Sequence, residues 1–105
     1  MRNPGTDRSG RTFGSAVIQA VWNKARISPG VDPAVRRKDA CGAWIDRAMY
    51  GVVTSNGTGW EIDHVLPVTR GGSDDIANLQ PLQWQNNRAK GDSLSGWSCA
   101  VAATS

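Results

Sequence analysis

The residue types best suited to chemistry in this 105-residue chain are a single histidine, His64, and the aspartate directly before it, Asp63. A histidine side chain, with an ordinary pKa of about 6.5, accepts and releases protons near neutral pH, and a carboxylate binds divalent cations. Adjacent strand residues point to opposite faces of a sheet, so this pair can flank one site only where a strand ends and twists. Pro67 lies just beyond the pair and supplies such an end. The presence of a single histidine, taken alone, favours a structural role for that residue over a catalytic one.

Two asparagines, Asn78 and Asn87, follow at positions that could complete a site. Gly71 and Gly72 permit a tight loop between His64 and Asn78. An order of strand, loop, strand and helix would then carry Asn87 back over Asp63. A carboxylate oxygen and an amide oxygen, with water in the remaining positions, form a set of hard ligands that suits Mg²⁺ or Mn²⁺.

The segment that must position these side chains has clear periodicity. Apolar and polar residues alternate over 60–66, which predicts a strand, and Pro67 ends or bends it. A polar, glycine-rich loop over 69–75 leads to a second short strand over 79–82, in which Pro81 indicates an edge. Residues 84–90 contain no helix breaker and predict a helix that Gly91 ends. A turn is expected at 56–57, before the first strand.

The flanking segments are less regular. Residues 1–14 lack periodicity and predict a flexible basic arm, and 93–105 predict a loosely ordered tail. Ser15 is expected to cap a helix that buries apolar residues at helical spacing and ends at 28–30. Asp32 and Pro33 can open a short helical turn. Residues 39–53 are ambiguous, although strand is one possibility.

Composition bounds the protein class. The chain carries 12 Lys and Arg against 9 Asp and Glu, for a net charge of +3. Basic residues dominate 8–38 and acidic residues dominate 39–75, which suits a protein that holds both a polyanion and a cation, although a solvated face explains the pattern as well. Two cysteines exclude a disulfide-rich scaffold and a four-thiolate zinc site. With no apolar run of membrane-spanning length and no signal-peptide pattern, we expect one cytoplasmic domain without membrane contact.

The spacing of the site residues resembles the HNH endonuclease motif. The resemblance rests on Asp63-His64, the Val-Leu-Pro at 65–67, Gly71-Gly72, Asn78-Leu79, and Asn87 with Lys90, and it covers about 60–92. Because the third motif position is asparagine, this is the His-Asn-Asn form. The runs at 38–45 and 59–64 also resemble small stand-alone HNH proteins of bacteria and phages. The resemblance implies an α+β fold: one small domain at 15–92 with an additional N-terminal helix and a ββα-metal core, an antiparallel two-stranded hairpin plus a helix.

The resemblance also implies a reaction. Asp63 and Asn87 would bind one divalent cation, Mg²⁺ or Mn²⁺, and His64 would be the general base that deprotonates water. Asn78 would tie the loop down and help to hold His64. The products would carry a 5′-phosphate and a 3′-hydroxyl. A monomer with one such site would nick DNA with low sequence specificity, and the oligomeric state expected is monomer or weak dimer.

Several basic residues are candidates for contacts with DNA phosphates. Three of them, at 36–38, are explained equally well as a solvated cluster. Asp39 and Asp46 are expected to pair with local arginines rather than to act in catalysis. The tryptophans are expected mainly in the core. The DNA-binding candidates are Arg36, Arg37, Lys38, Arg70, Arg88 and Lys90.

The chain departs from the family pattern where many members carry zinc-binding cysteines. Gln83 and Asn86 stand at one such pair of positions, so we expect no structural zinc. Cys41 is expected to be a small buried hydrophobe, and Cys99 lies in the tail, each without a close partner. Some relatives also place a histidine where Gln83 stands, and its absence leaves fewer ligands for the catalytic ion. The resemblance therefore implies weak metal affinity, with activity that needs millimolar Mg²⁺ or prefers Mn²⁺. Two alternatives stay open: an inactive HNH-fold DNA-binding accessory protein, and a nuclease toxin domain with an immunity partner.

Overall fold

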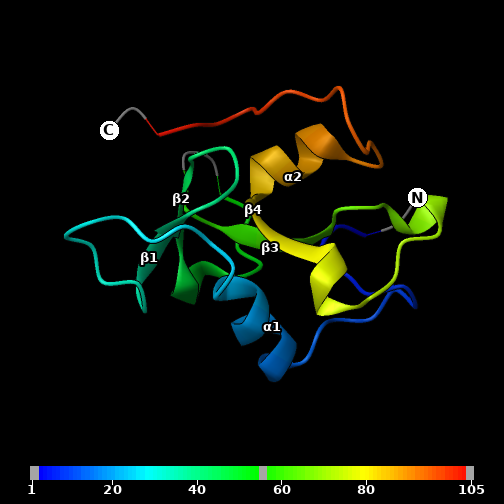
Figure 1. The fold of residues 1–105 in the computed structure, drawn as a ribbon, viewed down its shortest axis with the longest axis horizontal. Helices are drawn as coiled ribbons and strands as arrows, with labels where there is room; N and C mark the ends of the chain where they lie inside the picture. Colours follow the sequence, from blue (N-terminus) through cyan, green and yellow to red (C-terminus); the bar gives the residue numbers. More distant parts are fainter. Residues whose placement is uncertain (1–2, 55–56, 104–105) are drawn as a thin grey trace.

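The computed structural model describes residues 3–54 and 57–103. They form an α+β domain, as expected, with two antiparallel two-stranded sheets, of which the expected hairpin is one (Figure 1). Thr6 and Thr12 form an isolated bridge within the N-terminal segment 3–14. Asn56 of the expected turn at 56–57 lies outside the described residues. In order, the helices and strands are α1 (Ser15–Trp22), β1 (Arg36–Lys38), β2 (Trp44–Asp46), β3 (Trp60–His64), β4 (Leu79–Gln83) and α2 (Trp84–Lys90).

The expected order of strand, loop, strand and helix is confirmed. β3 pairs with β4 in a register that joins Trp60 to Gln83 and His64 to Leu79, and α2 follows β4 without an intervening loop. The Gln83 side chain makes this abrupt change possible because it accepts hydrogen bonds from the free backbone N–H groups of Gln85 and Asn86 at the start of α2. α2 ends at Lys90, before Gly91, as predicted. β3 ends at His64 rather than at residue 66.

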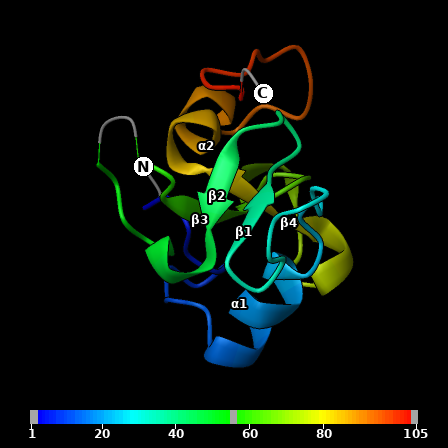
Figure 2. The same ribbon diagram turned by 90° about the vertical axis from the view of Figure 1, so that its left-hand side faces the viewer.

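The core lies where α1 covers the β3–β4 hairpin. α1 and α2 lie on opposite faces of this hairpin (Figures 1 and 2). Trp22 of α1 and Trp60 of β3 are fully buried, and their ring centroids are 5.4 Å apart. The expected core role is confirmed for these two tryptophans. α1 is shorter than predicted, because it ends at Trp22, and its N-cap is Gly14 rather than Ser15.

The ambiguous segment 39–53 contains β2, which pairs with β1. The turn between these strands is built around Asp39, whose side chain is 1% exposed. One carboxylate oxygen accepts hydrogen bonds from the backbone of Cys41 and Ala43, and the other accepts from the Gln83 backbone and the Asn86 side chain. The expectation that Asp39 pairs with an arginine is therefore wrong, because backbone and amide N–H groups satisfy it.

The C-terminal tail runs along the outside of α2 and is fastened there (Figures 1 and 2). The Asn86 side chain accepts hydrogen bonds from the backbone of Ala100 and Val101 and donates one to the Val101 carbonyl. A disulfide joins Cys41 to Cys99. The expectation that Cys41 is a hydrophobe without a close partner is therefore wrong. Its partner comes from 58 positions away in the sequence, a separation that local patterns do not reveal.

We expect removal of this disulfide to destabilise the domain. Cys99→Ser should lower the free energy of unfolding by about 2–4 kcal/mol, because the crosslink closes a long loop in the unfolded chain. Denaturant unfolding followed by tryptophan fluorescence measures this. A reductant should lower the wild-type midpoint and leave that of Cys99→Ser unchanged. Equal midpoints for oxidised wild type and the variant would contradict the prediction.

Candidate active site

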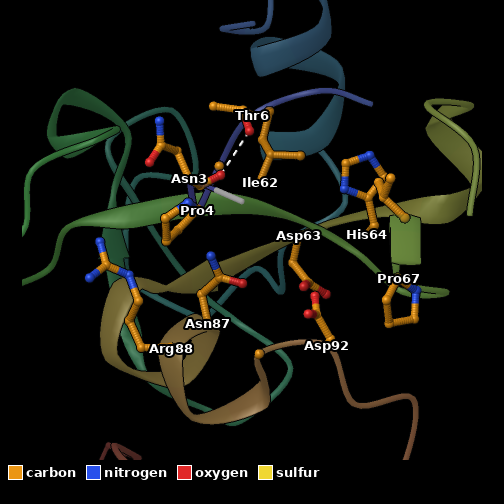
Figure 3. Close-up of a pocket in the computed structure, with 13 residues that line it drawn as sticks. Asn3, Pro4, Thr6, Ile62, Asp63, His64, Pro67, Asn87, Arg88 and Asp92 are labelled. Carbon is orange, nitrogen blue, oxygen red and sulfur yellow. Dashed lines mark hydrogen bonds between the residues drawn. The ribbon is translucent and has the colours of Figure 1, made fainter. Parts of the chain in front are cut away.

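The predicted site residues Asp63, His64 and Asn87 line one pocket with a volume of about 360 Å³ (Figure 3). β3 contributes the first two and α2 the third. The two neighbours on β3 point in different directions, as strand geometry requires, yet both reach the pocket because β3 ends at His64. Residues 3–6 of the N-terminal segment line the pocket too.

Asp63 is a buried carboxylate, 5% exposed, with a hydrogen-bond partner at each oxygen. Its cross-strand neighbour Gln80 donates to Oδ2 at 2.9 Å, and the Lys90 ammonium lies 3.2 Å from Oδ1. Burial raises the pKa of Asp63 above its ordinary value, and the contacts with Gln80 and Lys90 and the nearby His64 oppose that rise. Each carboxylate oxygen has a second lone pair, so the group can still accept a ligand from the pocket.

Lys90, predicted as a DNA contact, is instead 2% exposed. Its ammonium lies 3.2 Å from the Asp63 carboxylate and donates to the His64 carbonyl oxygen at 2.9 Å. Lys90 therefore provides the counter-charge for Asp63 and links the end of α2 to the end of β3. Its contact with DNA stays a prediction.

The amide of Asn87 is oriented by Glu61, which the sequence analysis did not single out. Asn87 Nδ2 donates to Glu61 Oε1 at 3.0 Å. Because a carboxylate only accepts hydrogen bonds, this contact fixes the amide nitrogen on Glu61. Figure 3 shows the amide oxygen turned toward Asp63. Glu61 is two residues before Asp63, and this alternation within the strand is the signal that could have identified it.

His64 is held by a residue that the sequence analysis also missed. Its Nε2 atom lies 2.8 Å from Asp74 Oδ1, and its ring is packed 6.0 Å from that of Phe13, centroid to centroid. Asp74 belongs to the loop over 69–75 that was predicted only as a polar connection. The spacing of residues along a loop carries no period, so the sequence offered no signal for this contact.

Asn78 closes that loop through its side chain. Its Oδ1 accepts from the Leu66 backbone, and its Nδ2 donates to the carbonyls of Leu66 and Ser73. Gly72 is required in the same turn, because a Cβ there would lie 1.7 Å from the Leu66 carbonyl oxygen. The contacts of the Asn78 side chain are with loop backbone, whereas the contact with the His64 ring comes from Asp74.

The remaining DNA-binding candidates fall into two groups. The three on β1 lie outside the pocket lining and have partners. Arg36 pairs with Asp46 at 2.7 Å, as expected. Arg37 donates to backbone carbonyls, and Lys38 lies over the Trp44 ring. Arg88 lines the pocket beside Asn87 and is 44% exposed, although it also contacts Glu61. Arg70 is exposed at the end of a short 3₁₀ turn, Val68–Arg70.

Comparison with known families addresses the motif directly. Residues 50–93 match the model of the HNH endonuclease family, described as "HNH endonuclease". This segment belongs to the HNH family. It includes β3, β4, α2 and the pocket residues those elements carry. Searches of the curated proteins and of the solved structures returned no match. In the described part of the chain, no helix is long and apolar enough to span a membrane.

HNH domains generally use a divalent metal ion, and the donor atoms here fit one. The described residues contain no cluster of three His, Cys, Asp or Glu side chains that could hold a metal, but the pocket lining does include the Asp63 carboxylate and the Asn87 amide. Both are hard oxygen donors, and the pocket leaves room for water, which is the set that Mg²⁺ and Mn²⁺ prefer. Asp92, an exposed carboxylate, lines the same pocket.

Replacement of Lys90 tests the buried pair. Lys90→Met should lower the free energy of unfolding by about 3–5 kcal/mol at neutral pH, because it leaves the Asp63 charge buried without its counter-ion. The loss of Lys90 raises the pKa of Asp63 further. The penalty is therefore present above that pKa and disappears as the pH falls and Asp63 becomes protonated.

The measurement is urea unfolding of wild type and variant across acidic and neutral pH. The double variant Asp63→Asn/Lys90→Met is the matched control, because it removes both charges and should recover much of the lost stability. A Lys90→Met penalty that does not change with pH would contradict the ion-pair explanation.

Proposed function

We propose that this protein is a metal-dependent DNA endonuclease that nicks DNA with low sequence specificity, using one Mg²⁺ or Mn²⁺ ion and leaving a 5′-phosphate and a 3′-hydroxyl. The observation that carries the proposal is the pocket in which a histidine, His64, meets the oxygen donors Asp63 and Asn87. Family membership of residues 50–93 supports a nuclease-type function at the coarser level.

Each residue has a distinct part in the proposed reaction. Asp63 and Asn87 would hold the divalent ion, which when bound would stabilise negative charge on the scissile phosphate and on the departing oxygen. His64 would accept the proton of the attacking water. Glu61 would keep the Asn87 oxygen toward the pocket, and Lys90 would supply the counter-charge for Asp63 within a buried site.

The substrate contacts follow from exposure. Arg88 lies at the pocket and is half-exposed, which supports a role in which it would contact a phosphate next to the scissile bond. Arg70 is exposed at the end of the turn that begins beside the pocket residues Pro67 and Val68. Lys38 and its neighbours on β1 would add contacts further along the DNA, and a net charge of +3 supports association with a polyanion.

A supercoiled-plasmid assay tests the activity. Wild type should produce open circles with Mg²⁺ or Mn²⁺ and none with EDTA. His64→Ala should reduce the nicking rate at least 100-fold, about the contribution of a general base, while its far-ultraviolet circular dichroism stays that of wild type. If wild type binds plasmid but leaves it supercoiled in both metals, the endonuclease proposal fails and a DNA-binding accessory role is supported.

Metal binding is measured separately by Mn²⁺ titration followed by electron paramagnetic resonance. Glu61→Ala should weaken Mn²⁺ binding about tenfold, because the Asn87 amide loses the partner that orients it. Glu61→Gln is the matched control: it also removes the charge that faces Arg88, but it keeps an oxygen that can accept from Asn87 Nδ2. Equal weakening in both variants would show that Glu61 acts through its charge rather than by orienting Asn87.

A further inference from the structure

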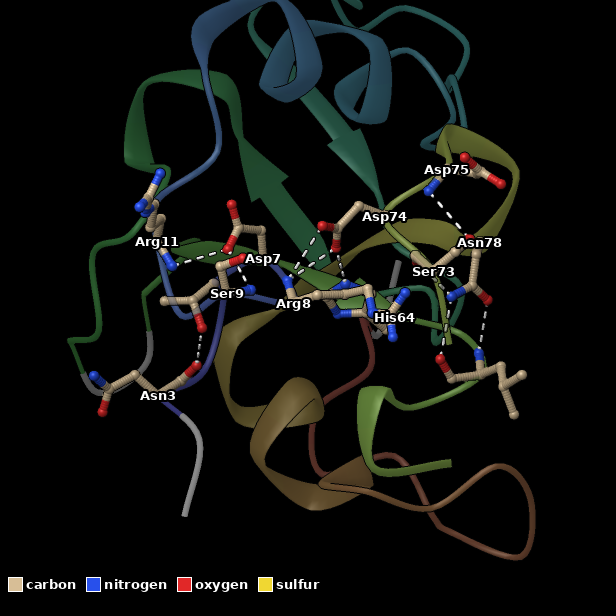
Figure 4. Close-up of polar contacts among 12 residues, drawn as sticks. Asn3, Asp7, Arg8, Ser9, Arg11, His64, Ser73, Asp74, Asp75 and Asn78 are labelled. Atoms are coloured by element: carbon tan, nitrogen blue, oxygen red, sulfur yellow. Dashed lines mark hydrogen bonds and ion pairs between the residues drawn. The ribbon is translucent and has the colours of Figure 1, made fainter. Parts of the chain in front are cut away.

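The loop carboxylate Asp74 contacts the catalytic candidate His64 and the N-terminal segment at the same time (Figure 4). Asp74 Oδ1 lies 2.8 Å from His64 Nε2. The same carboxylate accepts a hydrogen bond from the Arg8 backbone N–H, at 3.1 Å to Oδ1 and 3.3 Å to Oδ2. The sequence motif that predicts the active site includes neither Asp74 nor Arg8.

We propose that Asp74 is a positioning residue for His64. The inference rests on the proposed function, since it assigns the way in which the general base is oriented. A carboxylate accepts but does not donate, so the proton of the neutral imidazole must sit on Nε2, facing Asp74. The lone pair is then on Nδ1, and the contact with Asp74 decides which ring nitrogen can take a proton from water.

The geometry of Asp74 is fixed from two sides. On one side the 69–75 loop is closed by Asn78, which donates to the carbonyl of Ser73, the residue directly before Asp74. On the other side, Arg8 is the second residue of a tight turn in which the Gly10 N–H donates to the Asp7 carbonyl. The Asp7 carboxylate stabilises this turn further by accepting from the backbone of Ser9 and Arg11. The N-terminal segment thus holds the carboxylate that orients His64.

Stability alone does not account for this arrangement. The Asp74 side chain is 39% exposed, and the loss of its hydrogen bond to the neutral imidazole should cost only about 1 kcal/mol of folding free energy. The His64 ring, by contrast, is 8% exposed and is packed near Phe13. Removal of Asp74 should therefore change the state of the ring while leaving the fold almost as stable as before.

The single histidine makes the ring directly observable. In a long-range ¹H–¹⁵N spectrum of ¹⁵N-labelled protein, recorded where the imidazole is neutral, every imidazole signal belongs to His64. Wild type should show the Nε2–H tautomer. Asp74→Ala should show a mixture of tautomers or a shift to Nδ1–H. The matched control is Asp75→Asn, which removes a neighbouring exposed carboxylate and should keep the wild-type spectrum.

Cleavage kinetics provide the second readout. Asp74→Ala should lower kcat about tenfold or more with little change in KM for plasmid, and Asp74→Glu should recover part of the loss. Asp75→Asn should cleave as wild type does. A wild-type ring in the Nδ1–H form, or an Asp74→Ala ring and rate that match those of Asp75→Asn, would overturn the proposal. The expected spectra without cleavage by wild type would support the Asp74 contact and overturn the proposed function instead.

The contribution of the N-terminal segment is tested at Arg8. Arg8→Pro removes the backbone N–H that holds Asp74, and proline suits the second position of a tight turn. Arg8→Ala removes the same side chain but keeps the N–H. We expect only Arg8→Pro to alter the His64 tautomer and to lower kcat. Identical behaviour of the two variants would show that the Arg8 amide does not hold Asp74 in place.

Discussion

The site depends on a charged pair that is almost completely removed from water. Asp63 on β3 and Lys90 at the end of α2 are both buried, with 3.2 Å between Oδ1 and Nζ. Neither charge is stable there alone, because desolvation of an unpaired ion costs several kcal/mol. The pair therefore requires the end of α2 to lie against the end of β3. This requirement also brings Asn87, one helical turn before Lys90, to the same pocket.

The join between β4 and α2 satisfies the same requirement from the other end of the helix. Gln83 caps α2 directly after the strand, and Asn86 holds the C-terminal tail while Asp39 binds both residues. The HNH resemblance implies that Gln83 and Asn86 stand where many members of the family carry zinc-binding cysteines. The Asp39 carboxylate connects the turn between β1 and β2 to Gln83 and Asn86, and the Cys41–Cys99 disulfide connects the same turn to the C-terminal tail. The disulfide and the fully hydrogen-bonded Asp39 carboxylate both restrict the motion of the segments that they join. Such restraints matter in a small domain, because its small core holds these segments only weakly.

Local patterns in the sequence predicted the elements of the site more fully than its contacts. The strand over β3, the second strand and the helix ended by Gly91 all follow from alternation, proline and glycine, which act within a few residues. The contacts of Asp39 and Asp74 join residues that are distant in sequence or lie in a loop without a period. Such pairings depend on how the elements pack, so composition and spacing carry little information about them. The Cys41–Cys99 disulfide was not predicted for the same reason, because its two cysteines are 58 positions apart in the sequence.

The N-terminal segment also makes contacts that local sequence patterns do not predict. Its glycines and basic residues, without periodicity, predict only a flexible basic arm. In the structure, residues 3–6 line the pocket and the Arg8 amide binds Asp74. The Arg8 contact is made by a backbone group, and the lining of the pocket depends on where the chain lies, so side-chain patterns do not report either role. A domain whose ββα core spans only two strands and one helix has few elements with which to surround a pocket. The segment before the first helix therefore forms the side of the pocket that the ββα core leaves open, and it holds Asp74, the carboxylate that contacts His64.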